Sequence, residues 1–256
     1  MTVHALPNGR DLGGRTGAGG ARIRTGLVFR SAAPTDEAAA QALLDLDVRT
    51  VFDLRTTPER EAQPDDLPTE VRGIVADMLA DAPGSGAASL GRLAADAFAG
   101  RSVSLDADDV DAMMLESYRS FVTLDSAKNA TADFLRHLVE PGPGAVLFHC
   151  TAGKDRTGWL AALTLTALDV EEDEVMADYL ASGAMVEQMM APLAEAAAAR
   201  GLDLSALRPA MIVDPKYLRA AFDTLAQTYG TLADYLGTGL GLPADYREQL
   251  YARLLT

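Results

Sequence analysis

Apolar and polar positions follow two different patterns along the first half of the chain. Compact runs of β-branched and aromatic residues, bounded by turn residues, predict strands at 27–30, 48–54, 71–75 and 145–149. Apolar residues spaced three to four positions apart predict a helix over 35–46. Strands separated by helices are typical of an α/β fold with a central, mainly parallel sheet flanked by helices. Such a sheet has its binding crevice at the carboxyl ends of the strands.

The second half of the chain has the helical rhythm almost throughout. Asp214-Pro215 is typical of a helix start, with an N-cap residue followed by proline at the first helical position. No internal repeat or long linker is visible, so we expect one domain over 1–256 with a mostly helical C-terminal half. The helices predicted in this half are 156–168, 171–181, 185–200, 215–229, 232–236 and 244–254.

The stretch 81–111 interrupts the alternation of strands and helices. It starts with a Pro-Gly-Ser-Gly turn, continues through an alanine-rich helical piece to Phe98, and ends in the acidic residues 106–109. Such an insertion could be a mobile lid or an excursion packed permanently on the body, and the sequence leaves both interpretations open.

Composition narrows the possible chemistry. The formal charge of −15 argues against general affinity for nucleic acid or anionic membranes. A single cysteine excludes an internal disulfide framework and a multi-thiolate metal site, and three histidines leave little for another metal cluster. We therefore expect neither a metal nor a cofactor.

The sequence shows no targeting or membrane segment. No basic region followed by an apolar stretch opens the chain, and no apolar run approaches the ~20 residues of a membrane span. We expect a cytoplasmic protein without stable membrane insertion, although export without a signal stays open. The sequence makes no prediction of the oligomeric state.

The segment 149–158 has the clearest chemical pattern. Its sequence, His-Cys-Thr-Ala-Gly-Lys-Asp-Arg-Thr-Gly, follows the strongest predicted strand and opens a predicted helix. A loop in this place turns successive backbone N–H groups inward, and the positive end of the following helix reinforces the anion site that they form. Gly153 permits a backbone geometry that a Cβ would obstruct, and the planar fork of Arg156 can bind two phosphate oxygens.

These features predict a phosphate loop over 150–156. The same electropositive surroundings stabilise a thiolate at Cys150, which can attack phosphorus and form a phosphocysteine intermediate. Thr157 could donate a hydrogen bond to the departing thiolate, and His149 could orient the loop from behind. The residues predicted to bind the phosphate are Thr151, Ala152, Gly153, Lys154, Asp155 and Arg156.

The pattern Cys-x5-Arg-Thr resembles the phosphate loop of the cysteine-dependent phosphatases. The full ten-residue segment resembles a narrower group, the atypical bacterial protein-tyrosine phosphatases with their lipid-phosphatase-like relatives. Matches at 8–14, 27–31, 51–55 and 229–236 extend the resemblance over most of the chain. It implies a cysteine-phosphatase-like fold and hydrolysis of phosphotyrosine, with phosphoserine, phosphothreonine and phosphoinositides as further substrates. In this group the lysine of the loop, here Lys154, is associated with tolerance of phosphoinositides.

The sequence offers three candidates for the proton donor to the leaving group. Many cysteine phosphatases use an aspartate in a Trp-Pro-Asp loop, but Trp159 is followed by Leu160 within the predicted helix after the phosphate loop. The resemblance implies that Asp155 is the general acid. Asp77 and Asp81, just after the third strand, are the alternatives because strand ends line the crevice.

Several other functions share some of these sequence features. A protein that binds phosphorylated ligands without turnover, or an enzyme acting mainly on phosphoinositides, would carry many of the same residues. The pattern of nucleotide-binding P-loops fails, because Lys154 is followed by Asp155 and position 148 is phenylalanine. The glycine-rich run 237–241 follows a predicted helix, which favours a helix end and a turn over a nucleotide loop. Arg10 and Asp11 could brace the phosphate loop or form an ordinary buried ion pair.

The first 30 residues are basic although the chain is acidic. They contain five arginines against one aspartate. Such a segment could lie near an anionic ligand, or it could be a solvated loop with internal ion pairs.

Overall fold

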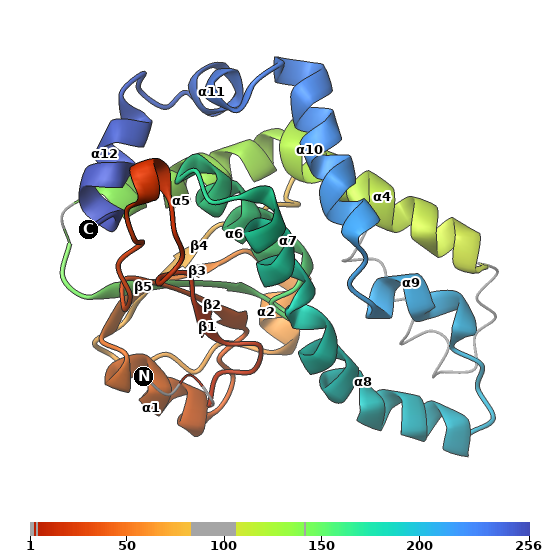
Figure 1. The fold of residues 1–256 in the computed structure, drawn as a ribbon. Helices are drawn as coiled ribbons and strands as arrows, with labels where there is room; N and C mark the ends of the chain where they lie inside the picture. Colours follow the sequence, from red (N-terminus) through yellow and green to blue (C-terminus); the bar gives the residue numbers. More distant parts are fainter. Residues whose placement is uncertain (1–2, 4, 83–105, 141) are drawn as a thin grey trace.

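The computed structural model describes residues 3, 5–82, 106–140 and 142–256. Among these residues, five strands form one sheet in the order β1-β2-β5-β3-β4, and only β1 runs antiparallel to its neighbour. Strand β5 therefore lies at the centre, between β2 and β3 (Figure 1). The strands are β1 (Arg10–Asp11), β2 (Val28–Ala32), β3 (Val48–Asp53), β4 (Arg72–Val75) and β5 (Ala145–Cys150).

Helices dominate the chain after β4. The described helices are α1 (Glu37–Asp45), α2 (Thr57–Ala62), α4 (Ala107–Thr123), α5 (Asp125–Val139), α6 (Asp155–Ala167), α7 (Glu172–Leu180), α8 (Ser182–Ala199), α9 (Arg208–Met211), α10 (Pro215–Tyr229), α11 (Leu232–Asp234) and α12 (Tyr246–Leu254). Short helical turns lie at η1 (Ala18–Gly20), η2 (Ser205–Leu207) and η3 (Tyr235–Gly239).

The alternation of side chains along the central strands separates two apolar cores. Leu147 of β5 and Val51 of β3 belong to the smaller core, which they form with residues of α1. Their neighbours Phe148 and Phe52 belong to the larger core with the helices that follow β4. Figure 1 shows α1 on one side of the sheet and α5, α6 and α12 on the other. Because both faces of the central strands are covered, β3 and β5 are buried at five of their six positions each, and their apolar runs made them visible in the sequence.

The predicted fold class is confirmed. All four predicted strands are present, their sheet is mainly parallel, and helices cover it on both faces. Element ends differ from the predicted ones by at most three residues, and α10 has the predicted bounds. The N-cap expected at Asp214 is present, since its carboxylate accepts a hydrogen bond from the N–H of Lys216.

Three short elements differ from what the hydrophobic pattern of the sequence predicts. Strand β1 is two residues long and has no run of its own to reveal it. Helix α2 begins with a capping box in which the side chain of Thr56 and that of Glu59 each cap the other's backbone. Residues 235–239 form a π-helical turn, so the glycine-rich run 237–241 starts inside a helical turn that extends beyond the predicted end at 236.

The insertion predicted over 81–111 can be followed only at its ends. Residues 83–105 lie outside the described residues, and the lid interpretation with them. The acidic end is a helix start: Asp106 caps the N-terminus of α4, and 107–111 are the first residues of that helix. Residues 107–111 thus lie in α4, because aspartates that resemble a polar loop are also favourable in the first turn of a helix, and the insertion over 81–111 stays a prediction.

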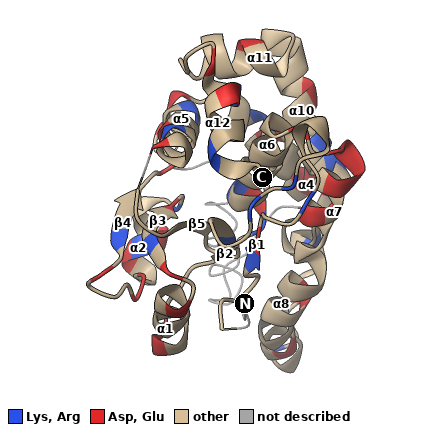
Figure 2. Cartoon of the chain, turned by 60° about the vertical axis from the view of Figure 1, so that its left-hand side comes forward, with Lys and Arg blue, Asp and Glu red and all other residues tan. Residues whose placement is uncertain are grey.

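Charged residues are distributed unevenly along the described part of the chain. Figure 2 shows acidic positions along α1 and α7 and basic positions beside β1 and α2. No helix in the part of the chain that the structure describes is long and apolar enough to cross a membrane.

Candidate active site

The predicted phosphate loop connects the central strand to a buried helix. Strand β5 ends at Cys150, whose exposed fraction is 3%, and α6 begins at Asp155. Because β2, β5 and β3 are parallel, the loop lies at the carboxyl edge of the sheet, as expected for a binding crevice. The N-terminus of α6 brings unpaired backbone N–H groups to the same place.

Gly153 is required by its surroundings. Its φ is +66°, a backbone conformation that residues with a Cβ rarely adopt. A Cβ at this position would lie 2.3 Å from the carbonyl oxygen of Ser31 in β2. The loop can therefore pack this closely against β2 only with glycine here.

Arg156 is held by a carboxylate that the sequence analysis missed. Its Nη1 and Nη2 donate to Glu59 of α2, at 2.7 Å to Oε2 and 2.6 Å to Oε1. Burial would lower the pKa of Arg156, but its hydrogen bonds to Glu59 and the charges of Cys150 and Glu59 raise it above the usual value. The guanidinium is thus permanently charged and fixed in orientation.

Glu59 collects further donors from its surroundings. Its Oε1 accepts a hydrogen bond from the Thr151 hydroxyl at 2.6 Å, and its Oε2 accepts from the N–H and the hydroxyl of Thr56 at 2.9 and 2.7 Å. Burial would raise the pKa of Glu59, but Arg156 and the two threonines lower it well below the usual value. One carboxylate therefore links α2, the phosphate loop and the arginine of the loop.

Lys154 is engaged outside the loop. Its ammonium contacts the carbonyl oxygen of Ala210 and lies 3.0 Å from that of Ile212, at the end of α9. It also lies 3.7 Å from Oδ2 of Asp155. A bound phosphate would therefore compete with two backbone carbonyls for this ammonium.

Asp155 lies against a pair of buried tyrosines. The hydroxyl of Tyr118 donates to Oδ1 of Asp155 at 2.8 Å and is 2.7 Å from the hydroxyl of Tyr179. Burial, and then the charge of Asp155, raise the pKa of Tyr118 well above the usual value, so its phenol stays protonated. Oδ1 of Asp155 is thus directed to Tyr118, which leaves Oδ2 beside Lys154.

Thr157 and His149 flank the loop on its buried sides. The Thr157 hydroxyl is fully buried and has no hydrogen-bond partner among the described residues, so its bond to a thiolate stays a prediction. Nδ1 of His149 is 3.2 Å from the carbonyl oxygen of Cys150, and its Nε2 is 3.1 Å from Oδ2 of Asp65. His149 thus contacts the end of β5 and Asp65, and its role in orienting the loop stays a prediction.

His149 belongs to a group that could supply ligands to a cation. One side-chain atom each from Asp53, Asp65 and His149 lies within 4.8 Å of the others. Arg55 already binds both carboxylates, with Nη2 at 2.8 Å from Asp53 and 2.6 Å from Asp65. A metal would have to displace this guanidinium, so the arrangement favours an ion-pair network.

Asp77 stabilises a local turn, and Asp81 contacts the start of α5. Asp77 accepts a hydrogen bond from the N–H of Leu79 at 2.9 Å. Asp81 accepts one from the N–H of Ser126 at 2.6 Å, in the first turn of α5. Neither is hydrogen-bonded to the phosphate loop.

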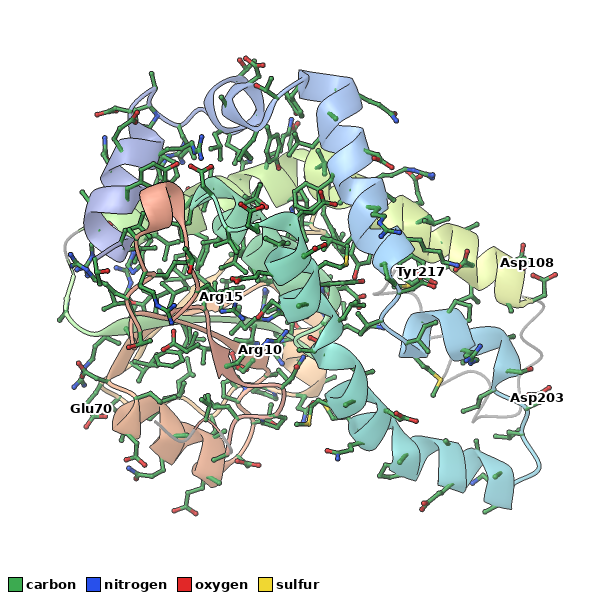
Figure 3. The ribbon with its side chains drawn as sticks, viewed as in Figure 1. Arg10, Arg15, Glu70, Asp108, Asp203 and Tyr217 are labelled. Atoms are coloured by element: carbon green, nitrogen blue, oxygen red, sulfur yellow. The ribbon has the colours of Figure 1, made fainter. Side chains whose placement is uncertain are left out.

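The basic N-terminal segment turns inward. Arg10, Arg15 and Arg30 all contact the carboxylate of Asp178 in α7, at 3.0, 2.7 and 2.6 Å. Figure 3 shows Arg10 and Arg15 close to the sheet, beneath α7. Arg30 is fully buried, and burial lowers its pKa to about 10 against the opposing effect of Asp178, so it remains charged at neutral pH. Of the two interpretations of this segment, internal ion pairing is what the structure contains.

This arginine group also reaches the phosphate loop. Nη2 of Arg30 donates to the carbonyl oxygen of Gly153 at 2.8 Å. Nδ2 of Asn8 donates to the carbonyls of Ala152 and Gly153 at 3.0 and 2.9 Å. Ion pairing and bracing of the loop are therefore parts of one arrangement.

Sequence reasoning missed Glu59, Asn8, Asp178 and Tyr118. Glu59 had a detectable signal, because Thr56-x-x-Glu59 has the spacing of a capping box. Asn8 lies inside the stretch 8–14 that resembles the phosphatase family, but no local pattern marks it as a residue of the site. Asp178 and Tyr118 are ordinary members of helical patterns, and only the fold brings them to the site.

Known proteins resemble this chain over nearly its whole length. The tyrosine phosphatase family matches residues 1–256. A Cupriavidus necator protein assigned by name to the tyrosine-protein phosphatases is 32% identical over 242 residues, which cover 94% of this chain and 84% of that protein. The triple specificity protein phosphatase PtpB of Mycobacterium tuberculosis is 31% identical over 265 residues, which cover 92% of this chain and 93% of PtpB. The chain is therefore a phosphatase and belongs to the tyrosine phosphatase family.

Proposed function

We propose that the protein hydrolyses phosphotyrosine through a phosphocysteine intermediate on Cys150, with residues 1–256 acting as a single phosphatase domain. The observation that carries this proposal is the position of Arg156, fixed by Glu59 at the start of the helix that follows Cys150. Glu59 binds the Nη1–Nη2 edge of the guanidinium, which leaves the second hydrogen of Nη2 and Nε, buried and without a partner among the described residues, for the equatorial oxygens of a phosphoryl group during transfer.

The reaction has two balanced steps. In the first, the Cys150 thiolate attacks phosphorus, the S–P bond forms, and the bond from phosphorus to the leaving oxygen breaks. Asp155 protonates that oxygen. In the second, Asp155 accepts a proton from a water molecule that attacks phosphorus, and the S–P bond breaks to return the thiolate and free phosphate.

The other loop residues bind charge in this scheme. Backbone N–H groups of 151–156 and the guanidinium of Arg156 bind the phosphate oxygens, and Lys154 adds a second charge. Thr157 donates a hydrogen bond to the thiolate as it departs. Asp77 and Asp81 are weaker candidates for the acid, since their hydrogen bonds go to Leu79 and Ser126 and neither is hydrogen-bonded to the phosphate loop.

A substrate range wider than phosphotyrosine is part of the proposal. The Mycobacterium tuberculosis relative is named a triple specificity protein phosphatase. Its resemblance over most of both chains supports activity on phosphoserine, phosphothreonine and phosphoinositides as well. Lys154 would first have to leave the carbonyls of Ala210 and Ile212 to reach a second anionic group.

A phosphate-release panel without added metal tests this function. It compares p-nitrophenyl phosphate, phosphotyrosine, phosphoserine and phosphothreonine peptides, and vesicles containing phosphoinositides, using the wild type and Cys150→Ser. We expect release that is fastest from phosphotyrosine among the peptides and absent in the variant. Substantial release by Cys150→Ser would refute the covalent route. Phosphopeptide binding by the wild type without any release would make the protein a non-catalytic binding module.

A further inference from the structure

Asn8 has an unusual position for a residue outside the loop it contacts. It has a φ of +55° and an exposed fraction of 4%. Its Nδ2 donates to the carbonyls of both Ala152 and Gly153, at 3.0 and 2.9 Å. One amide group thus binds two successive peptide units of the phosphate loop.

The orientation of this amide is determined by its other side. Oδ1 of Asn8 accepts a hydrogen bond from Nη1 of Arg10 at 2.7 Å. Arg10 is itself held by Asp178 at 3.0 Å and by the hydroxyl of Ser182 at 2.9 Å. Since a guanidinium can only donate, the oxygen of Asn8 must face Arg10 and its nitrogen must face the loop.

The planarity of the peptide bond gives these contacts a consequence for the anion site. In a trans peptide the N–H points opposite to the C=O of the same unit. Drawing the carbonyls of Ala152 and Gly153 towards Asn8 therefore points the N–H groups of Gly153 and Lys154 the other way. If these peptide units rotated, carbonyl oxygens would face a bound phosphate and repel it.

We propose that Asn8 is a positioning residue for phosphate binding, whose side-chain amide holds two loop carbonyls back so that the N–H groups face the anion. The proposal rests on the function proposed above. Asn8 does not touch the phosphate; it acts through the peptide units that do. Arg30 assists at one of these units, because it donates to the carbonyl of Gly153 at 2.8 Å.

Asn8→Gly removes the amide without disturbing the backbone, because glycine adopts a positive φ readily. Asp47→Gly is a matched control, since Asp47 has a φ of +52° and its exposed side chain pairs with Arg49, away from the loop. Asn8→Asp gives a second variant, in which a carboxylate can still accept from Arg10 but presents an oxygen to the two carbonyls.

Each substitution is placed in Cys150→Ser protein, and the dissociation constant of inorganic phosphate is measured by calorimetry. We expect affinity to fall about tenfold in Asn8→Gly, consistent with the loss of two buried hydrogen bonds, and further in Asn8→Asp. Asp47→Gly should leave it unchanged. Thermal midpoints without phosphate show whether each variant is folded, and only the folded fraction is compared.

A purely structural role would lower the midpoint and leave the phosphate affinity of the folded molecules at the level of the control. That result would overturn the proposal. In otherwise wild-type protein, Asn8→Gly should raise the KM for p-nitrophenyl phosphate more than it lowers kcat, and a change in kcat alone would also contradict it. These outcomes are separable from the proposed function, which fails if Cys150→Ser still releases phosphate.

Discussion

Two buried ionic clusters flank the phosphate loop, and their charge balance is opposite. On the β3 side, the carboxylate-rich cluster consists of Asp53, Asp65 and Glu59 with Arg55 and Arg156. On the side of the N-terminal segment, the arginine-rich cluster consists of Arg10, Arg15 and Arg30 with Asp178. Three carboxylates face two guanidinium groups in the first, and three guanidinium groups share one carboxylate in the second.

The two clusters act on different parts of the loop. The carboxylate-rich cluster fixes a charged side chain, Arg156, which we propose binds the phosphate. The arginine-rich cluster instead binds backbone carbonyls, directly through Arg30 and indirectly through Asn8. This cluster also lies close enough to Cys150 for a charge on that side chain to raise the pKa of Arg30, against the larger effect of burial. The charged side chain of Arg156 is oriented by a counter-charge, whereas the peptide units of the loop are oriented by hydrogen-bond donors to their carbonyl groups.

The largest expected effect is on stability, when the arginine-rich cluster loses its one carboxylate. In Asp178→Asn three guanidinium groups remain without a counter-charge around a side chain that is 1% exposed. We expect the free energy of unfolding to fall by about 3 kcal/mol at pH 7, as for other broken buried pairs. Denaturant unfolding measures it. Glu116→Gln, which removes an exposed pair with Arg119, is the control and should change stability by less than ~1 kcal/mol.

The same variant should show a defined pH dependence. Burial would raise the pKa of Asp178, but Arg30, Arg10 and Arg15 lower it below the usual value. The ionised form is therefore favoured by folding, and its contribution is complete above the unfolded pKa of about 4 and lost as pH falls further. The difference between wild type and Asp178→Asn should shrink below pH 4. A difference that grows there would contradict the assignment.

A smaller effect, on activity, is expected from the carboxylate-rich cluster. Glu59→Gln leaves one acceptor oxygen for a guanidinium that now has two, and its amide would face a cation. We expect kcat/KM for p-nitrophenyl phosphate to fall about 100-fold, because Arg156 would no longer be held in one orientation. The loss of stability should be less than in Asp178→Asn, since Glu59 is partly exposed. A change in kcat/KM below threefold would show that the arginine is oriented without its partner.

The smallest effect is expected outside both clusters, at Tyr118. Tyr118→Phe removes the donor to Asp155 at 2.8 Å without changing any charge. If Asp155 is the general acid, the rate should fall about three- to tenfold with a phosphotyrosine peptide and less with p-nitrophenyl phosphate, whose leaving group needs little proton assistance. Tyr217→Phe is the control, because Tyr217 stacks on Tyr118 but donates to Asp111. Equal losses on both substrates would assign Tyr118 a purely structural role.

The sheet and its helices could be predicted because burial determines them locally. Strands β3 and β5 are covered on both faces, so their apolar runs stand out, and α10 carries a cap and a proline at its start. Strand β1 could not be predicted, because two residues have no periodicity. The acidic residues 106–109 did not reveal the start of α4, because aspartate favours both loops and first helical turns.

The loop itself was predictable and its supports were not. Cys150, Gly153 and Arg156 fall within one short segment whose spacing has a chemical meaning. The partners of that segment come from positions 97 and 145 residues away, as with Glu59 to Arg156 and Asn8 to Gly153. Such contacts depend on tertiary packing, and the capping box at Thr56 was the one local pattern that could have directed attention to Glu59.

The single cysteine allows the protein to be labelled at one known position. The chain holds one sulfhydryl in 256 residues, and it sits at the end of β5 with an exposed fraction of 3%. The mass added to the intact protein by a thiol-selective alkylating reagent therefore measures reaction at a single known atom, Sγ of Cys150. Because that atom is buried, the half-time of labelling measures how often the surrounding loop opens. A ligand that slows alkylation reveals the fraction of the site that it occupies, without any chromogenic substrate.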